Sequence, residues 1–246
     1  MKSYNYLIFS ILCFCISCGP KYYAPNIQNV PLLKERGDAQ ISGSISEYSY
    51  EIQSATAITN NFAAQFNLAS FHNSNTSEDE TSTVTQNGKY AEFGAGYYNG
   101  GLTPIIFESY LLGGLGSSNN IYTDQNVMSD TRGNLDSKFS KLSFQQNLGI
   151  KYKYFEFALS GRISRVDLFN YSGNLIYQNI DQVNYLDVNN GFFIVEPALT
   201  LRVGLEEAKM QIQFQRSHNL TNSRFNQHES SISIGLQFPF YTNSTF

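Results

Sequence analysis

The sequence has no tryptophan, few charged residues and only three cysteines, all of them before residue 20. Charged residues make up 15% of the 246 positions, against about 25% in ordinary soluble domains. Cys13, Cys15 and Cys18 lie in one short N-terminal stretch. Removal of a leader there leaves at most one cysteine, which excludes an internal disulfide and a zinc site of cysteine type. No metal site is expected.

Other absences narrow the functional classes further. The net charge is -4 with no run of basic residues, which excludes the usual footprint of a nucleic-acid-binding protein. After residue 20 no stretch stays apolar for the roughly 18 residues that a transmembrane helix needs. Phosphate-binding motifs are missing as well, because the glycine-rich run at 113–116 follows a strand pattern and opens no helix. No cofactor is therefore expected.

The sequence is instead rich in aromatic residues, with 17 Tyr and 19 Phe. Both residue types favour strands, and aromatic belts mark membrane interfaces. The mean hydropathy of -0.28 is that of a soluble protein. A transmembrane β-barrel needs apolar side chains only at every second position, so an average hydropathy does not detect one.

The clearest pattern runs from Phe139 to Asp167. Apolar residues there fall on every second position and polar residues on the positions between them, which places the apolar side chains on one face of an extended chain. The two runs meet near Lys153 and Tyr154 and predict one antiparallel hairpin. Its arms are long enough for the roughly 9–11 residues that a tilted strand needs to cross a bilayer.

Similar runs recur along the chain and predict about ten strands. Short connections alternate with long polar ones, as in bacterial barrels with short periplasmic turns and long external loops. The predicted long loops are 72–88, 117–138, 168–190 and 217–229. The sequence thus predicts an all-β fold, a closed antiparallel transmembrane β-barrel, with a β-bulge at Pro197. A soluble periplasmic β-sandwich is the alternative fold.

The N-terminus carries the features of an exported protein. Residues 1–17 have one lysine and then an apolar core, which predicts a signal peptide. The sequence around Ser17 and Cys18 resembles a bacterial lipoprotein signal, although Cys15 departs from the usual leucine. This resemblance implies that Cys18 is lipidated. The proline-rich residues 18–37 are expected to form an extended tether, and residues 38–246 the barrel.

Several further segments carry a resemblance to a family. They are the Cys18 signal, residues 29–33 with Gly37, the run Ser54 to Phe62, and the C-terminal Phe246. With them the chain is similar to the small outer-membrane β-barrel lipoproteins of Bacteroidota-type cell envelopes. The resemblance implies a monomer in the outer membrane, with membrane lipid and the lipoprotein and barrel-assembly machinery as partners. No acidic run follows Cys18, which by this resemblance implies a lipid-anchored N-terminus on the periplasmic side.

Charged residues on the polar parity of the strands are expected to lie in the lumen. They are Glu92, Glu108, Lys151, Glu156, Arg162, Glu196 and Arg202. Buried charges need partners, so the favoured interpretation is a filled interior held together by ion pairs and hydrogen bonds. The alternative is a narrow ion or solute channel that these charges make selective.

Catalytic chemistry has weaker support in the sequence. His72, His218 and His228 are expected to be solvated loop residues. His218 or His228 beside Asp79 would be the arrangement of an outer-membrane hydrolase, but no local signature supports it. Two loops offer oxygen ligands for Ca²⁺, one with Asp124, Asp130, Asn134 and Asp136 and the other with Asp181 and Asp187. Their spacing does not match a known calcium loop. We therefore expect a non-enzymatic protein that acts structurally or through its external loops.

Overall fold

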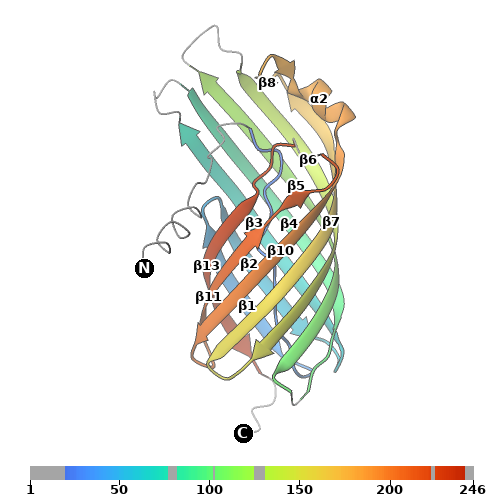
Figure 1. Cartoon of the computed structure of the whole chain (residues 1–246), viewed down its shortest axis with the longest axis vertical. Helices are drawn as coiled ribbons and strands as arrows, with labels where there is room; N and C mark the ends of the chain where they lie inside the picture. Colours follow the sequence, from blue (N-terminus) through green and yellow to red (C-terminus); the bar gives the residue numbers. More distant parts are fainter. Residues whose placement is uncertain (1–19, 77–81, 102, 125–130, 223–224, 242–246) are drawn as a thin grey trace, which may run out of the picture.

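Ten strands form one closed antiparallel barrel in the computed structural model (Figure 1). Each strand pairs with its neighbour in the chain, and β13 pairs with β1 to close the ring. The structure describes residues 20–76, 82–101, 103–124, 131–222 and 225–241, so the predicted signal peptide, Cys18 and Phe246 lie outside the described residues. The closed ring confirms the predicted barrel and makes the sandwich alternative wrong.

At the end of the barrel with the short turns, the strands begin and end close to where the alternation predicted. The ten barrel strands are β1 Ala39–Ser46, β2 Ser49–Ala57, β3 Phe62–Thr76, β4 Ser82–Tyr98, β5 Ile105–Asp124, β6 Gly133–Lys151, β7 Phe155–Gly173, β10 Gly191–Gly204, β11 Lys209–Arg216 and β13 Ser230–Phe240. The shorter elements are β8 Ile176–Tyr177, β9 Ile180–Asp181, α2 Gln182–Val188 and β12 His218–Asn219. No described helix has the length and apolar content to cross a membrane.

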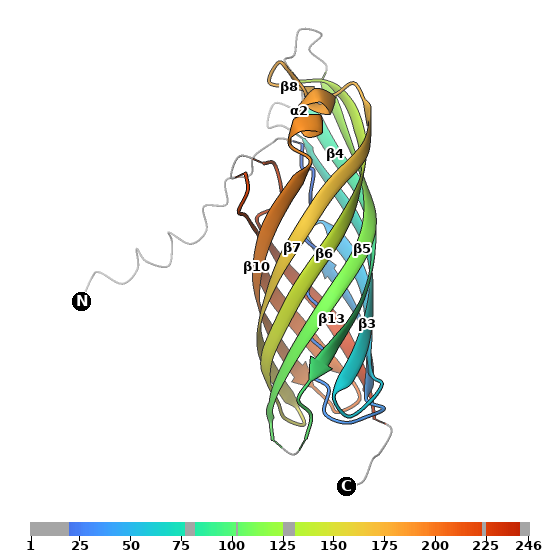
Figure 2. The ribbon, with the colours of Figure 1, turned by 90° about the vertical axis from the view of Figure 1, so that its right-hand side faces the viewer.

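All four predicted long loops contain strand residues, although 217–229 holds only the two-residue β12. Residues 72–76 pair with residues 83–87. Strand β5 continues to Asp124, and β6 begins at Gly133. The third, 168–190, contains the end of β7, the β8–β9 hairpin and helix α2. Apart from Ile121 and Phe169, these extensions are polar on the outer face, so they lack the apolar alternation that marks the membrane part of a strand. The wall built by β3 to β7 therefore rises above the shorter strands (Figures 1 and 2).

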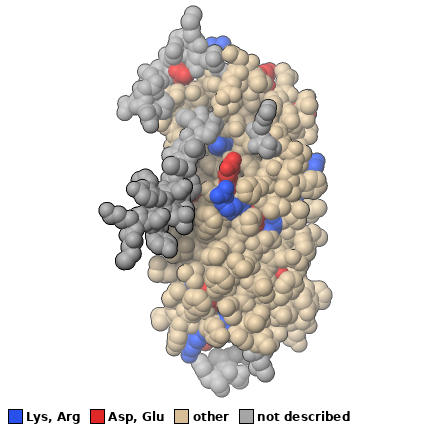
Figure 3. Space-filling view, viewed as in Figure 1, with Lys and Arg blue, Asp and Glu red and all other residues tan. Residues whose placement is uncertain are grey.

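The parity of the strands sorts side chains as predicted. Leu111, Phe144, Leu148 and Leu159 lie on the outside, between 44% and 60% exposed. Polar neighbours of the opposite parity, such as Asn147, are buried in the lumen. Charged atoms are sparse on the face of the wall seen in Figure 3. The barrel thus has an apolar exterior and a polar interior, the reverse of a soluble protein.

The predicted bulge at Pro197 is wrong. Pro197 pairs in regular register with Gly161 of β7, and the register of β10 with β11 and with β12 is the same on both sides of the proline. The ladder to β11 and β12 has no bridge at Glu196 and Pro197, where the proline lacks an N–H to donate. The irregularity in the described strands lies instead between Asp136 and Lys138 of β6.

The N-terminal segment 20–37 runs through the inside of the barrel. Tyr22 contacts the end that carries the long connections, where its N–H donates to Asn226 O (2.9 Å). Lys34 lies at the end with the short turns, where its carbonyl accepts from Gly101 N (3.1 Å). Long loops outside and an N-terminus on the periplasmic side were both expected. These two expectations cannot hold together, because the described part of the segment enters the lumen from the long-loop end. The anchor residue Cys18 itself lies outside the described residues.

An occluded lumen as the candidate functional site

The N-terminal segment fills the lumen with an extended chain. Almost every residue from Pro20 to Leu33 is buried, and Val30 and Leu32 have no exposed surface. Three prolines keep the segment extended and remove donors that would otherwise need partners. The predicted extended segment at residues 18–37 is therefore, over its described part, a plug within the barrel, which we call the lumen segment (residues 20–37).

Side chains of the wall accept hydrogen bonds from the backbone N–H groups of the lumen segment. Ile27 N donates to Glu51 Oε1 (2.9 Å) and Leu33 N donates to Glu108 Oε1 (2.9 Å). Gln213 Oε1 accepts from the backbone N–H of Gln28 (2.9 Å). Irregular backbone at membrane depth is stable only where such partners replace water, so these carboxylates and amides hold the segment in place.

Wall side chains also donate to the carbonyl groups of the lumen segment. Arg162 Nη2 donates to Asn26 O (2.7 Å), and Lys151 Nζ donates to Leu32 O (2.9 Å). Gln145 Nε2 donates to Asn29 O (2.7 Å) between these two points. The partners come from strands on several sides of the ring, so the segment is bound along its length by the wall.

The structure places all seven predicted lumen charges inside the barrel, each at most 8% exposed. They do not form one network. Glu156 pairs with Arg202 (2.9 Å) at one level, and Glu196 pairs with Arg162 (2.6 Å) at another. Glu92 accepts from Asn67 (2.9 Å), and, as above, Glu108 and Lys151 bind the backbone of the lumen segment.

Three further buried charges of the barrel strands were missing from the predicted set. Lys209 donates to Glu156 Oε1 (2.8 Å), and Lys141 lies 3.8 Å from Glu196 Oε2. Glu51, which binds the lumen segment, is the third. All three have the same lumen parity as the predicted residues, so the alternation of the strands contained the signal that would have found them.

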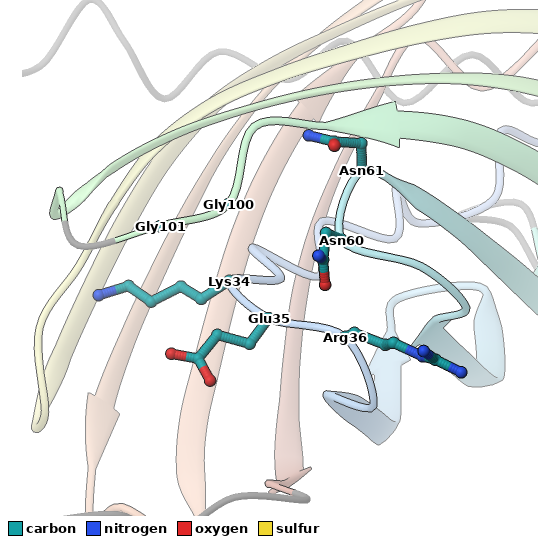
Figure 4. Close-up of a pocket in the computed structure, with 7 residues that line it drawn as sticks. All are labelled: Lys34, Glu35, Arg36, Asn60, Asn61, Gly100 and Gly101. Atoms are coloured by element: carbon teal, nitrogen blue, oxygen red, sulfur yellow. The ribbon is translucent and has the colours of Figure 1, made fainter.

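At the short-turn end, the lumen segment leaves the barrel beside an open pocket of about 520 Å³ (Figure 4). Lys34, Glu35 and Arg36 line it together with two turns of the barrel. A Cβ on Gly100 would overlap the carbonyl oxygen of Lys34, so the turn at Asn99–Gly101 can approach the segment only with glycine at that position. This close contact fixes the exit of the segment.

At the opposite end, His228 contacts both the lumen segment and the wall. Its backbone N–H donates to Tyr23 O (3.1 Å), its ring stacks on Tyr48 with centroids 4.2 Å apart, and its Nε2 lies 2.9 Å from Gln86 Oε1. Burial lowers the pKa of His228 to about 4, and repulsion by Lys21 adds to this effect. The expectation that His228 is a solvated loop residue is therefore wrong.

The other candidates for chemistry do not meet in one place among the described residues. His72 and His218 are exposed on β3 and β12, whereas Asp79 lies outside the described residues. Asp181 caps helix α2 by accepting from Val183 N (2.9 Å), which uses one of the proposed calcium ligands. Within the described part of the chain no group of three or more His, Cys, Asp or Glu side chains is arranged to hold a metal ion.

Comparisons with known proteins give structural likenesses only. No protein-family model matches the chain, and no curated protein matches it. The translocator domain of autotransporter NalP from Neisseria meningitidis is similar at 9% identity and a TM-score of 0.49, over 82% of this chain and 86% of that one. LpxR from Salmonella typhimurium is similar at 7% identity and a TM-score of 0.41, over 83% and 100% of the two chains. Function has to be argued from this chain's own residues.

Proposed function

We propose that this chain is a non-enzymatic outer-membrane β-barrel lipoprotein that its own N-terminal segment keeps closed. The observation that carries the proposal is the lumen segment, which runs between the two ends of the barrel and is bound by the wall throughout. A lumen occupied in this way supports a structural or surface-interaction role for a monomer, rather than transport.

The exterior of the barrel supports a membrane location. Exposed Leu, Ile and Phe side chains cover the outward positions of the strands, and the strands of β3 to β7 exceed the roughly 9–11 residues needed to cross a bilayer. An even number of antiparallel strands is usual for bacterial outer-membrane barrels. Membrane lipid and the barrel-assembly machinery are then the expected partners.

The position of the lumen segment also determines which leaflet a lipid anchor at Cys18 would enter. Cys18 is two residues before Pro20, and two residues span at most about 7 Å. A lipidated Cys18 would therefore insert its acyl chains into the leaflet at the long-loop end. With the long loops outside, the anchor is in the outer leaflet, and the chain passes back through its own barrel to reach β1.

Surface interaction is supported by the apolar residues at the long-loop end. Val188 is 84% exposed at the end of α2, Leu220 is 61% exposed and Ile180 is 54% exposed. These side chains lie outside the ten barrel strands. They offer an external apolar surface for the proposed contact with another molecule.

Two measurements test this function. Radiolabelled palmitate should enter the wild-type protein and not the Cys18→Ser variant. A tag inserted at 125–130 should be cleaved by protease added to intact cells, whereas a tag between Glu206 and Glu207 should be protected. Cleavage at Glu206 in intact cells would reverse the orientation, and equal palmitate labelling of both proteins would exclude the anchor at Cys18.

A channel remains the second candidate, because the lumen is lined with charged side chains. The wall charges described above bind each other or the lumen segment, so conduction would require the segment to leave the barrel. A full-length protein that conducts in planar bilayers would favour this function over the closed barrel.

A further inference from the structure

We propose that a groove on the outer wall of the barrel binds the phosphate-bearing headgroup of an anionic lipid. The groove has a volume of about 510 Å³ and crosses strands β3 to β7. Its lining includes Ser70, His72, Lys89, Ser117, Asp136 and Lys138. The inference rests on the proposed membrane location.

The groove begins where the apolar exterior ends. Leu68, Ala91 and Leu115 are cross-strand neighbours on the outside of the wall. Two residues further along each strand, toward the long-loop end, the outward row is Ser70, Lys89, Ser117 and Lys138. Two residues of a strand advance about 7 Å, so the change from apolar to basic takes place over the depth of a lipid headgroup.

Two lysines make this row electropositive. Lys89 and Lys138 each pair with Ser117, which lies on the strand between them. Strands are spaced about 4.8 Å apart, so the two flexible lysine side chains start about 10 Å from each other and can converge on one anion. Neither lysine forms an ion pair with another described residue.

The next outward row supplies polar groups. His72 Nδ1 lies 2.7 Å from Asn87 Oδ1, and Asn119 Nδ2 donates to Asp136 Oδ1 (2.8 Å). Asp136 is the one acidic residue of the groove, and it lies on the side away from the apolar belt. The lysine row between this carboxylate and the belt is therefore the place for a phosphate.

Charge and position together select a lipid as the occupant. A phosphate at the lysine row would place the acyl chains of its lipid over Leu68 and Leu115, which are 42% and 65% exposed. A free phosphate would gain nothing from these apolar side chains. Lysines near a membrane surface attract anionic lipid, so two of them should favour an anionic over a zwitterionic lipid.

Lipid binding to the purified full-length barrel tests the inference. The probes are dioleoyl phosphatidic acid, dioleoyl phosphatidylcholine and inorganic phosphate, with bound lipid counted by native mass spectrometry. Phosphatidic acid should bind saturably, and Lys89→Gln with Lys138→Gln should weaken its binding at least tenfold. The matched control, Lys34→Gln with Lys153→Gln at the short-turn end, should bind as the wild type does.

Three outcomes would overturn the inference. They are equal binding of phosphatidylcholine, an unchanged affinity in the Lys89 and Lys138 variant, and displacement of the lipid by millimolar inorganic phosphate, which would indicate a free-anion site. Asp136→Asn provides a second variant in case the first does not fold, and it should tighten binding because a nearby negative charge is removed. A heat-modifiable gel band shows whether each variant still folds into a barrel. Loss of the band would contradict the proposed membrane barrel, whereas loss of lipid binding with the band retained would concern the lipid site alone.

Discussion

At the residue scale, Arg162 shows how one buried side chain joins the wall to the lumen segment. Its guanidinium donates to Glu196 on the neighbouring strand (2.6 Å) and to the carbonyl of Asn26 (2.7 Å). Arginine can do both because its planar group carries five donors in fixed directions. Removal of such a group leaves a buried carboxylate and a buried carbonyl with fewer partners.

Arg162→Met should therefore destabilise the barrel by about 3–5 kcal/mol, because it breaks a buried ion pair. Arg165→Met is the matched control on the same strand. Arg165 pairs with Asp167 (2.6 Å), but both side chains are at least 40% exposed, and such pairs are worth about 0–1 kcal/mol. Urea unfolding in detergent micelles measures both. A loss of the same size in the two variants would contradict the structural role of the buried pair.

His228 gives a prediction for the dependence of stability on pH. Its pKa in the folded protein is about 4, below the value of about 6.5 expected in the unfolded chain. Between these values the unfolded state binds the extra proton, so stability falls as the pH falls from about 6.5 to about 4. His228→Phe retains an aromatic ring against Tyr48 and removes the titration. The wild type should lose more thermal stability than this variant between pH 7 and pH 4, and parallel losses would contradict the assignment.

At the element scale, alternation predicted the barrel strands but not their full length. The outer face of β4 is apolar at Phe93 and Ala91 and polar at Lys89, Asn87 and Thr85. The backbone continues to pair through all five positions, because hydrogen bonding needs no apolar face. Beyond the membrane a strand and a polar loop have similar compositions, which is why residues 72–88 were predicted as a loop.

The place of the lumen segment could not be predicted from its own sequence. Residues 20–37 have no alternation, and an extended proline-rich chain looks the same in solvent and inside a barrel. The charges Glu51 and Glu108 gave an indirect signal, since buried carboxylates need donors and here the donors are backbone N–H groups of the segment. The lumen charges were predictable from parity, whereas their partners on the lumen segment were not.

The parity of β6 predicts how its outer face responds to charge. Leu148 lies outward near the middle of the apolar belt and is 52% exposed, whereas Ser140 lies outward at its upper edge. Arginine costs about 2–4 kcal/mol at the bilayer midplane and about 0–1 near an interface. Leu148→Arg should therefore impair folding into lipid vesicles far more than Ser140→Arg, measured by the heat-modifiable gel band. Equal effects would argue against a membrane around this strand.

Because the lumen is filled, a lumen-facing position cannot serve as the control for Leu148→Arg. An arginine at Asn147 would be tolerated if the lumen were open and polar. Asn147 is 1% exposed and donates to Glu108 Oε2 (2.8 Å), which in turn holds the backbone of Leu33. No space remains there for a longer side chain, so Asn147→Arg should also disrupt the barrel, and only outward positions make a fair comparison.

At the scale of the whole molecule, the barrel and the lumen segment stabilise each other. The segment satisfies carboxylates and amides that would otherwise face an empty channel, and the wall satisfies the backbone of the segment. Apolar contacts add to this at both ends, where Tyr22 packs on Phe225 and Leu33 packs in a cluster with Tyr98 and Tyr110. The closed state is therefore a property of the complete chain.

Deletion of residues 20–35 should open the barrel to ions. The variant retains residues 1–19 and the first strand, and it exposes the lumen charges to water. In planar bilayers the full chain should give no steps of conductance, and the deletion variant should give discrete steps. Deletion of residues 125–130 is the control that should stay silent. A synthetic peptide of residues 20–35, added from the long-loop side, should block the steps because the wall still presents its hydrogen-bonding partners.

Conductance of equal size in the full chain would refute the closed barrel. A deletion variant that folds but stays silent would show that the wall closes the lumen without the segment.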